Sequence, residues 1–261
     1  MLDFKIGDLV TRISHQHDVL FKIVDFEGSI AILKGVDLRL YADCEISDLT
    51  RAYKEDNDYD KQVVERNFKD LQIDRSQYFY LPGKILHIDG DGEYLDRCMN
   101  FYKNMNIKAN GITIPEVEIS EKILGLLQEF RPDIVVVTGH DAYYSKKNNT
   151  SDLENYQNTA NFIEAVRVAR KYEKSQDKLI IIAGACQSNY EELIKAGANF
   201  ASSPKRINIH ALDPAIIASS LALSDRNQSI DLIRLIEKTK YGKDGIGGII
   251  TNGTMYVGYP R

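Results

Sequence analysis

The pattern of apolar and polar positions along residues 81–261 predicts a single α/β domain. Short apolar runs predict strands at 84–89, 110–115, 133–139, 179–185 and 199–203. Apolar residues spaced every three or four positions predict helices at 93–105, 119–130, 152–173, 189–196, 213–223 and 229–240. This alternation implies right-handed crossovers, and therefore a mostly parallel sheet covered by helices on both faces. The glycine-rich tail, 245–258, is expected to form a terminal hairpin.

The first 80 residues follow a different pattern. Short β segments at 5–12, 19–24, 29–34 and 37–40 are separated by turn signals, which predicts a small SH3-like β barrel over residues 1–52. Residues 53–80 are strongly charged and predict a linker between this barrel and the α/β domain. Arg66 and Arg75 would be exposed basic positions in such a linker, which makes it a candidate for self-cleavage.

Composition indicates an intracellular protein. The chain has 261 residues, a net charge of −5 and three cysteines, an odd number that argues against a disulfide framework. We expect a cytoplasmic location with no membrane partner, because the start lacks a secretory signal and no apolar run approaches the ~20 residues of a membrane span. The mild acidity and dispersed basic residues argue against nucleic acid as the main partner.

Two of the predicted strands lead directly into reactive side chains. His140 follows the apolar run that starts at Ile134, and Cys186 follows the run that starts at Leu179. The carboxyl ends of parallel strands meet at one edge of a sheet, where such folds bind ligands. The separation of 186 − 140 = 46 residues leaves room for one crossover helix. Neither Cys44 nor Cys98 has such a context, so both are expected to be structural.

A thiol and an imidazole at one sheet edge predict nucleophilic catalysis. Cys186 would attack a carbonyl carbon, and His140 would act as general base and then general acid. The backbone N–H groups of Asp141 and Cys186 are the candidates for an oxyanion hole. This chemistry requires no metal and no organic cofactor. The histidine-then-cysteine order and spacing agree with the caspase pattern, although residues 184–188 and Asp141 differ from the caspase signature. We expect a caspase-like α/β fold.

Three other readings fit parts of the sequence. Cys186 could instead pair with His210 in an amidase, since residues 184–188 loosely resemble the nucleophile elbow of glutamine amidotransferases. Residues 85–92 resemble the aspartate loop of haloacid dehalogenases, which would imply magnesium-dependent phosphoryl transfer. A non-catalytic scaffold or binding protein, whose α/β domain holds a degenerate pocket, is the third alternative.

Longer motifs extend over nearly the whole chain. They are Lys5-Ile6-Gly7-Asp8, Pro82-Gly83-Lys84 with Asp89-Gly90-Asp91, Arg131-Pro132-Asp133 through Gly139-His140-Asp141-Ala142-Tyr143, Ala183-Gly184-Ala185-Cys186-Gln187-Ser188, Ala196-Gly197-Ala198-Asn199-Phe200-Ala201-Ser202-Ser203-Pro204 and Asn208-Ile209-His210-Ala211-Leu212-Asp213-Pro214. In these motifs the chain resembles the YabG family of sporulation-specific cysteine peptidases.

The resemblance implies an endopeptidase that trims spore coat and related proteins, with a preference for cleavage after arginine. Such an enzyme would work in the mother cell of a sporulating bacterium and could associate with the forming coat. Asp89 and Asp91 follow the first strand of the α/β domain, and in caspase-like folds the loop after that strand lines the specificity pocket. Either carboxylate could pair with a substrate guanidinium.

Overall fold

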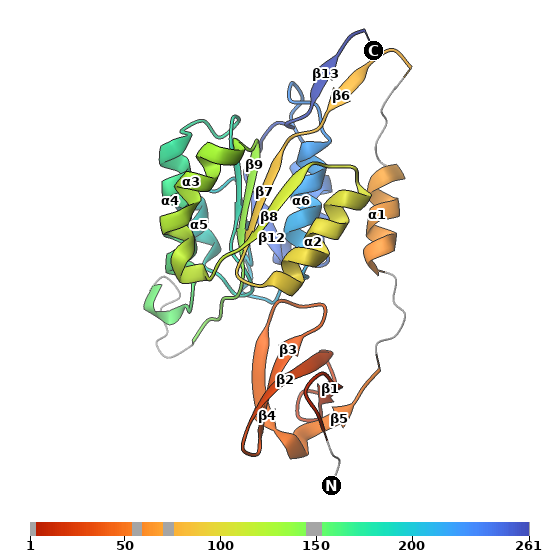
Figure 1. The fold of residues 1–261 in the computed structure, drawn as a ribbon, viewed down its shortest axis with the longest axis vertical. Coiled ribbons are helices and arrows are strands. Elements are labelled where there is room, and N and C mark those ends of the chain that lie inside the picture. The colour runs from red at the N-terminus through yellow and green to blue at the C-terminus, as the bar shows by residue number, and fades with distance from the viewer. Residues whose placement is uncertain (1–3, 54–58, 70–75, 145–152, 261) are drawn as a thin grey trace. The chain divides into compact units, whose positions relative to one another are not determined.

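The computed structural model describes residues 4–53, 59–69, 76–144 and 153–260 (Figure 1). Contacts within the chain divide it into two compact units, Met1–Tyr59 and Asp60–Arg261. Each unit has its own core and is described separately below. The domain boundaries predicted at residues 52 and 80 remain predictions.

The first unit is an antiparallel β structure with the strand order β4-β3-β2-β1-β5. Its elements are β1 (Leu9–Arg12), β2 (Phe21–Glu27), β3 (Ile30–Gly35), β4 (Tyr41–Glu45), the 3₁₀ helix η1 (Ile46–Asp48) and β5 (Leu49–Arg51). Alternate residues point inward, so that Val10, Phe21, Ile23, Leu33 and Leu49 form a small buried core. A five-stranded antiparallel sheet of this kind is compatible with the small barrel predicted from the sequence.

The second unit is built on a six-stranded sheet with the order β12-β11-β10-β9-β7-β8. The strands are β7 (Ile85–Asp89), β8 (Ala109–Thr113), β9 (Ile134–Thr138), β10 (Ile180–Ala183), β11 (Phe200–Ser202) and β12 (Ile246–Gly248). Neighbouring strands are parallel except β12, which runs antiparallel to β11. The mostly parallel α/β sheet expected from the sequence is therefore confirmed, and each of its first five strands lies within two residues of the predicted range.

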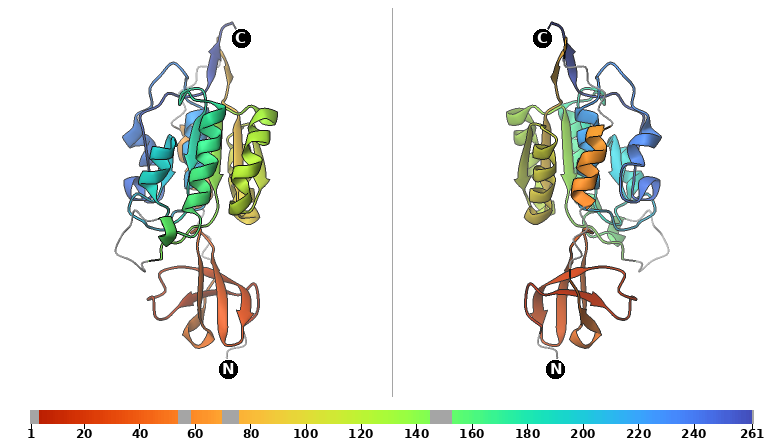
Figure 2. Two further views of the ribbon diagram at one scale, coloured as in Figure 1. Left: turned by 90° about the vertical axis from the view of Figure 1, so that its left-hand side faces the viewer. Right: turned by 90° about the vertical axis from the view of Figure 1, so that its right-hand side faces the viewer.

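Helices cover both faces of this sheet. They are α1 (Tyr59–Lys69), α2 (Gly92–Asn104), α3 (Ile119–Phe130), α4 (Thr159–Tyr172), α5 (Tyr190–Ala196), α6 (Asp213–Ala222) and α7 (Leu232–Ile236), with 3₁₀ turns η2 (Glu116–Glu118), η3 (Leu153–Asn155) and η4 (Gly242–Asp244). Figure 2 shows α3, α4 and α5 side by side over one face, while α2 and α6 lie on the other. All residues of β7, β9 and β10 are buried as a result.

The glycine-rich tail does not form the predicted hairpin, and that expectation is wrong. β12 joins the main sheet, whereas β13 (Tyr256–Gly258) pairs with β6 (Phe79–Leu81) in a separate two-stranded sheet. The tail glycines reflect close packing, because a Cβ atom on Gly247 would collide with Tyr190 and one on Gly248 with Phe200.

Part of the segment expected to be a linker is helical and belongs to the second unit. Helix α1 buries Val63, and the guanidinium of Arg97 in α2 makes two hydrogen bonds to the Asp60 carboxylate, at 2.6 and 2.7 Å. Arg66 donates a hydrogen bond of 2.6 Å to the carbonyl oxygen of Lys238. Arg75, the other basic position expected in the linker, lies outside the described residues.

Candidate active site at the carboxyl edge of the sheet

Strands β9 and β10 bring His140 and Cys186 to the same edge. The two strands are parallel neighbours in which Ile134 pairs with Ile180, an offset of 180 − 134 = 46 residues. His140 and Cys186 have the same offset, 186 − 140 = 46, and each lies just beyond the end of its strand. Adjacent strands lie about 4.8 Å apart. The register therefore gives the two residues equivalent positions beyond neighbouring strands. That these strands are neighbours is as the sequence predicts, whereas the catalytic pairing remains a prediction.

The loop around Cys186 turns sharply. Gly184 has a φ of +98° and Gln187 a φ of +57°, two left-handed positions that flank the cysteine. Gln187 is held on both sides, since its N–H donates to the carbonyl oxygen of Ile207 at 3.1 Å and its side-chain oxygen accepts from the N–H of Tyr143 at 3.1 Å. The bond to Tyr143 connects this loop to the residues that follow β9, and the bond to Ile207 connects it to the segment after β11.

The Cys186 thiol is almost fully buried, with 1% of the residue exposed. Its sulfur accepts a hydrogen bond of 3.2 Å from the backbone N–H of Ile209. A donor directed at the sulfur compensates negative charge there. The Tyr241 phenol also lies in this region: burial raises its pKa, and the nearby Asp213 and Cys186 raise it further.

Two carboxylates face the imidazole of His140. Its Nε2 lies 3.4 Å from Oδ2 of Asp91, and its Nδ1 lies 3.5 Å from Oε1 of Glu116. The backbone N–H of His140 donates to the same Glu116 oxygen at 2.7 Å. The Tyr94 ring packs against the imidazole with a centroid distance of 5.7 Å. Asp91 also accepts from the N–H groups of residues 93 and 94 and so caps helix α2.

Glu116 is the part of this site that the sequence analysis missed. Burial alone would raise its pKa, but the hydrogen bonds from the side chain and backbone of His140 outweigh that effect and lower it. The available signal was its place three residues after β8, at the same edge of the sheet as His140. No feature of residues 115–118 distinguishes Glu116 from its neighbour Glu118.

Asp141 links the two strand ends through its buried carboxylate. One oxygen accepts from the N–H groups of Ala142 and Asn158, and the other accepts from the hydroxyl groups of Thr159 and Ser188. Burial raises the pKa of this carboxyl despite the four donors. Within the described residues, the backbone N–H of Asp141 makes no hydrogen bond. Its role as an oxyanion-hole donor remains a prediction.

Asp89 and Asp91, the residues predicted to bind substrate arginine, have different surroundings. Asp89 is fully buried at the end of β7, where Oδ1 accepts the N–H of Asp91 at 2.9 Å. Its Oδ2 lies 3.7 Å from Nε2 of His87, and Nδ1 of His87 lies 2.8 Å from the Tyr102 hydroxyl. Asp91 is the one of the pair that reaches His140.

His210, the histidine of the amidase alternative, is held by its own backbone turn. Its Nδ1 accepts the N–H of Leu212 at 3.1 Å, and its own N–H donates to Asp213 at 3.0 Å. It immediately follows Ile209, whose N–H reaches the Cys186 sulfur. His210 thus belongs to the same region of the fold as Cys186.

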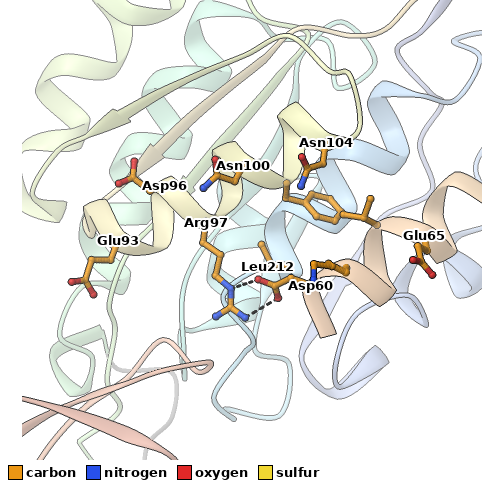
Figure 3. Close-up of a pocket in the computed structure, with 11 residues that line it drawn as sticks. Asp60, Glu65, Glu93, Asp96, Arg97, Asn100, Asn104 and Leu212 are labelled. Carbon is orange, nitrogen blue, oxygen red and sulfur yellow. Dashed lines mark hydrogen bonds and ion pairs between the residues drawn. The ribbon is translucent and has the colours of Figure 1, made fainter. Parts of the chain in front are cut away.

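A hollow of about 560 Å³ lies between α1 and α2, away from His140 and Cys186. Figure 3 shows Arg97 and Asp60 joined within it, while Asp96 points away from them. Its lining mixes charged, amide and apolar side chains; among them are Glu65, Glu93, Asn100, Asn104 and Leu212.

The described residues contain no group of three or more His, Cys, Asp or Glu side chains placed to hold a metal ion. Within the same residues, no helix is both long enough and apolar enough to cross a membrane.

The comparisons with known proteins identify the class of this chain as peptidase. The model of the family described as "YabG peptidase U57" matches residues 5–260. The "Sporulation-specific protease YabG" of Bacillus subtilis (strain 168) is 40% identical over 286 aligned positions, which cover 99% of both chains. No solved structure matches the chain.

The chain therefore belongs to the YabG peptidase family. It is a protease of sporulation, as the resemblance noted in the sequence implies.

Proposed function

We propose that the chain is a cysteine endopeptidase whose reaction is carried by Cys186 and His140. The main support is the register of β9 and β10, which gives the two residues matching positions at the carboxyl edge of the sheet. The N–H of Ile209 directed at the sulfur adds to this, because a hydrogen-bond donor there can compensate negative charge that develops during the reaction.

The proposed reaction has two halves. His140 takes the proton of Cys186, and the sulfur attacks the carbonyl carbon of the scissile peptide bond. The resulting oxyanion is stabilised by the backbone N–H groups of Asp141 and Cys186. His140 then protonates the leaving amine as the C–N bond breaks, which leaves a thioester on Cys186. Water, deprotonated by His140, hydrolyses the thioester and restores the thiol.

The proposed specificity is for arginine before the scissile bond. Asp89 and Asp91 are the carboxylates predicted to pair with the guanidinium, and Asp91 is the one beside His140. Since Cys186 is buried, the bound peptide would have to displace part of its surrounding loop. Exchange of Asp89 or Asp91 for Asn should lower the ratio of kcat/KM for arginine over glutamine substrates, and an unchanged ratio would remove that residue from the pocket.

The proposed setting is the mother-cell cytoplasm of a sporulating bacterium, with association to the forming spore coat. Spore coat and related proteins would be the substrates, and the fold would be caspase-like with an SH3-like barrel before it. Self-cleavage near Arg66 would require α1 to open first, because Arg66 lies within that helix.

The test compares wild-type protein with the variants Cys186→Ala, His140→Ala and His210→Ala. Each is incubated with an arginine-rich coat-type protein, and new termini are mapped by mass spectrometry. We expect termini after arginine from wild type and His210→Ala, and none from the other two. Activity that survives His140→Ala but not His210→Ala would instead favour the amidase-like pair, and a glutaminase assay would then be informative. Absence of cleavage by every protein would favour the scaffold.

A further inference from the structure

We propose that Glu116 is a positioning residue that fixes the orientation of the His140 imidazole for the reaction. The inference rests on the proposed Cys186–His140 chemistry and adds a third residue to it. A general base must hold its ring in one orientation and one tautomer to receive the thiol proton, and a carboxylate against the far ring nitrogen provides both.

The geometry joins Glu116 to His140 at two points. Oε1 accepts the backbone N–H of His140 at 2.7 Å and lies 3.5 Å from Nδ1 of the same residue. The carboxylate is thus fixed to the main chain that carries the ring, with the same oxygen beside Nδ1. In the Nδ1–H tautomer that this contact would favour, Nε2 would be the nitrogen that receives the thiol proton.

The path of the Glu116 side chain accounts for two glycines at this edge. The strand order here is β9-β7-β8, and Glu116 follows β8 while His140 follows β9. The Glu116 side chain must therefore cross the end of β7. A Cβ atom on Gly90, just after β7, or on Gly139, just after β9, would collide with the Glu116 carboxylate. Because both residues are glycines, they leave room for the Glu116 carboxylate.

The Glu116 side chain is negatively charged at neutral pH. Its pKa is lowered by hydrogen bonds from His140, which outweigh the effect of burial, so the side chain is ionised at neutral pH. On the other side of the ring, Oδ2 of Asp91 lies 3.4 Å from Nε2 and can stabilise the imidazolium formed after proton transfer. Asp91 already caps α2, whereas the Glu116 carboxylate contacts the backbone and ring of His140.

The experiment measures kcat and KM across pH for wild type, Glu116→Gln and the control Glu118→Gln. Glutamine can still accept the His140 N–H, so the exchange removes charge with little change of shape. Glu118 lies two residues away, with its side chain 44% exposed and paired with Lys122. We expect Glu116→Gln to lose about 100-fold in kcat with KM within a few-fold, the loss typical of a reacting group misplaced by ~1 Å. Its pH profile should also change shape, whereas a purely structural defect would lower the whole profile evenly.

Two further measurements, the ¹⁵N NMR shifts of His140 and the activity of His140→Ala, complete the test. The ¹⁵N NMR shifts of His140 in wild-type protein should report the Nδ1–H tautomer, a readout that does not depend on how the variant folds. A Glu116→Gln variant within 2-fold of wild type, or an Nε2–H tautomer, would overturn the inference while leaving the dyad intact if His140→Ala is inactive. An active His140→Ala variant would instead show that the proposed dyad itself is wrong.

Discussion

The Ser188 hydroxyl donates a hydrogen bond of 2.7 Å to the buried carboxylate of Asp141. Asp141 directly follows His140, and Ser188 lies two residues after Cys186, so this one contact joins the two halves of the proposed site. The same Ser188 oxygen accepts the N–H of Ala185 at 2.9 Å, which shapes the loop that carries the thiol.

Replacing Asp141 with Ala should destabilise the protein strongly. The exchange leaves two backbone N–H groups and two hydroxyl groups without their buried acceptor. We expect a loss of about 3 kcal/mol in the free energy of unfolding, measured by urea denaturation. Asp141→Asn should cost less, because it keeps one acceptor oxygen and removes a charge that burial disfavours. The control is the exposed Asp177→Ala; equal stability of the two alanine variants would refute the role of Asp141.

Gly139→Ala should reduce activity by displacing Glu116. The added methyl group would occupy the position of the Glu116 carboxylate, which then loses its contact with Nδ1 of His140. We expect at least about a 10-fold loss of kcat. Gly125→Ala is the matched control, since a methyl group there meets nothing within 4 Å and lies in the interior of α3. That control should keep activity and gain up to about 1 kcal/mol in stability. Full activity of Gly139→Ala would contradict the proposed role of Glu116.

The sequence predicted the parts of the fold and site that depend on local pattern. The apolar runs before His140 and Cys186 are buried strands, and their parallel pairing follows from the crossover helix between them. Helix α4 nevertheless begins at Thr159, seven residues after the predicted start, where the Asp141 carboxylate contacts its first turn.

The parts that the sequence did not predict depend on contacts between distant segments. Glu116 reaches His140 only because β8 lies one strand beyond β7 in the sheet, an order that no local pattern specifies. The hairpin predicted for the tail is wrong for the same reason. β12 pairs with β11, and β13 pairs with β6. In the second pairing Tyr256 lies opposite Leu81, a residue 256 − 81 = 175 positions earlier in the chain. A glycine-rich pattern indicates turns and close approach, but it does not identify the partner strand.

Removal of Cys44 and Cys98 together should leave the proteolytic activity intact. Cys44 lies in β4 of the first unit, and Cys98 lies in α2 with its thiol donating to the carbonyl oxygen of Ala211 at 3.4 Å. The Cys98 contact does not involve His140, and Cys44 belongs to the other unit. We expect the Cys44→Ala/Cys98→Ala protein to keep kcat/KM within about 3-fold and to lose about 1 kcal/mol of stability, mostly from the buried Cys98. A loss of activity in the folded double variant would place one of these thiols in the reaction.

Glu116 should also contribute to the pH dependence of stability. Its pKa is lower in the folded protein than the ordinary value of 4.5, so its stabilising effect is present above about pH 4.5 and is lost as the pH falls through the folded value. The stability advantage of wild type over Glu116→Gln, followed by Tm from pH 7 to pH 3, should therefore shrink below about pH 4.5. An advantage that grows as the pH falls below about 4.5 would mean that burial, rather than the His140 hydrogen bonds, dominates at this carboxyl.

Asp60→Asn should expose helix α1 to proteolysis. The ion pair between Asp60 and Arg97 holds the first turn of α1 against α2, and the Arg66 contact with Lys238 lies further along the same helix. The Asp60 and Arg97 side chains are 40% and 19% exposed, so solvent weakens the pair and its loss should cost only about 0.5–1 kcal/mol. We expect trypsin to cut at Arg66 about 2- to 5-fold faster, because cleavage follows the population of opened helix. Asp96→Asn, a neighbour in the same hollow that points away from Arg97, is the control (Figure 3). If both variants are cut at the wild-type rate, the Asp60–Arg97 pair does not restrain α1, and any self-cleavage near Arg66 must be limited by other contacts of this helix.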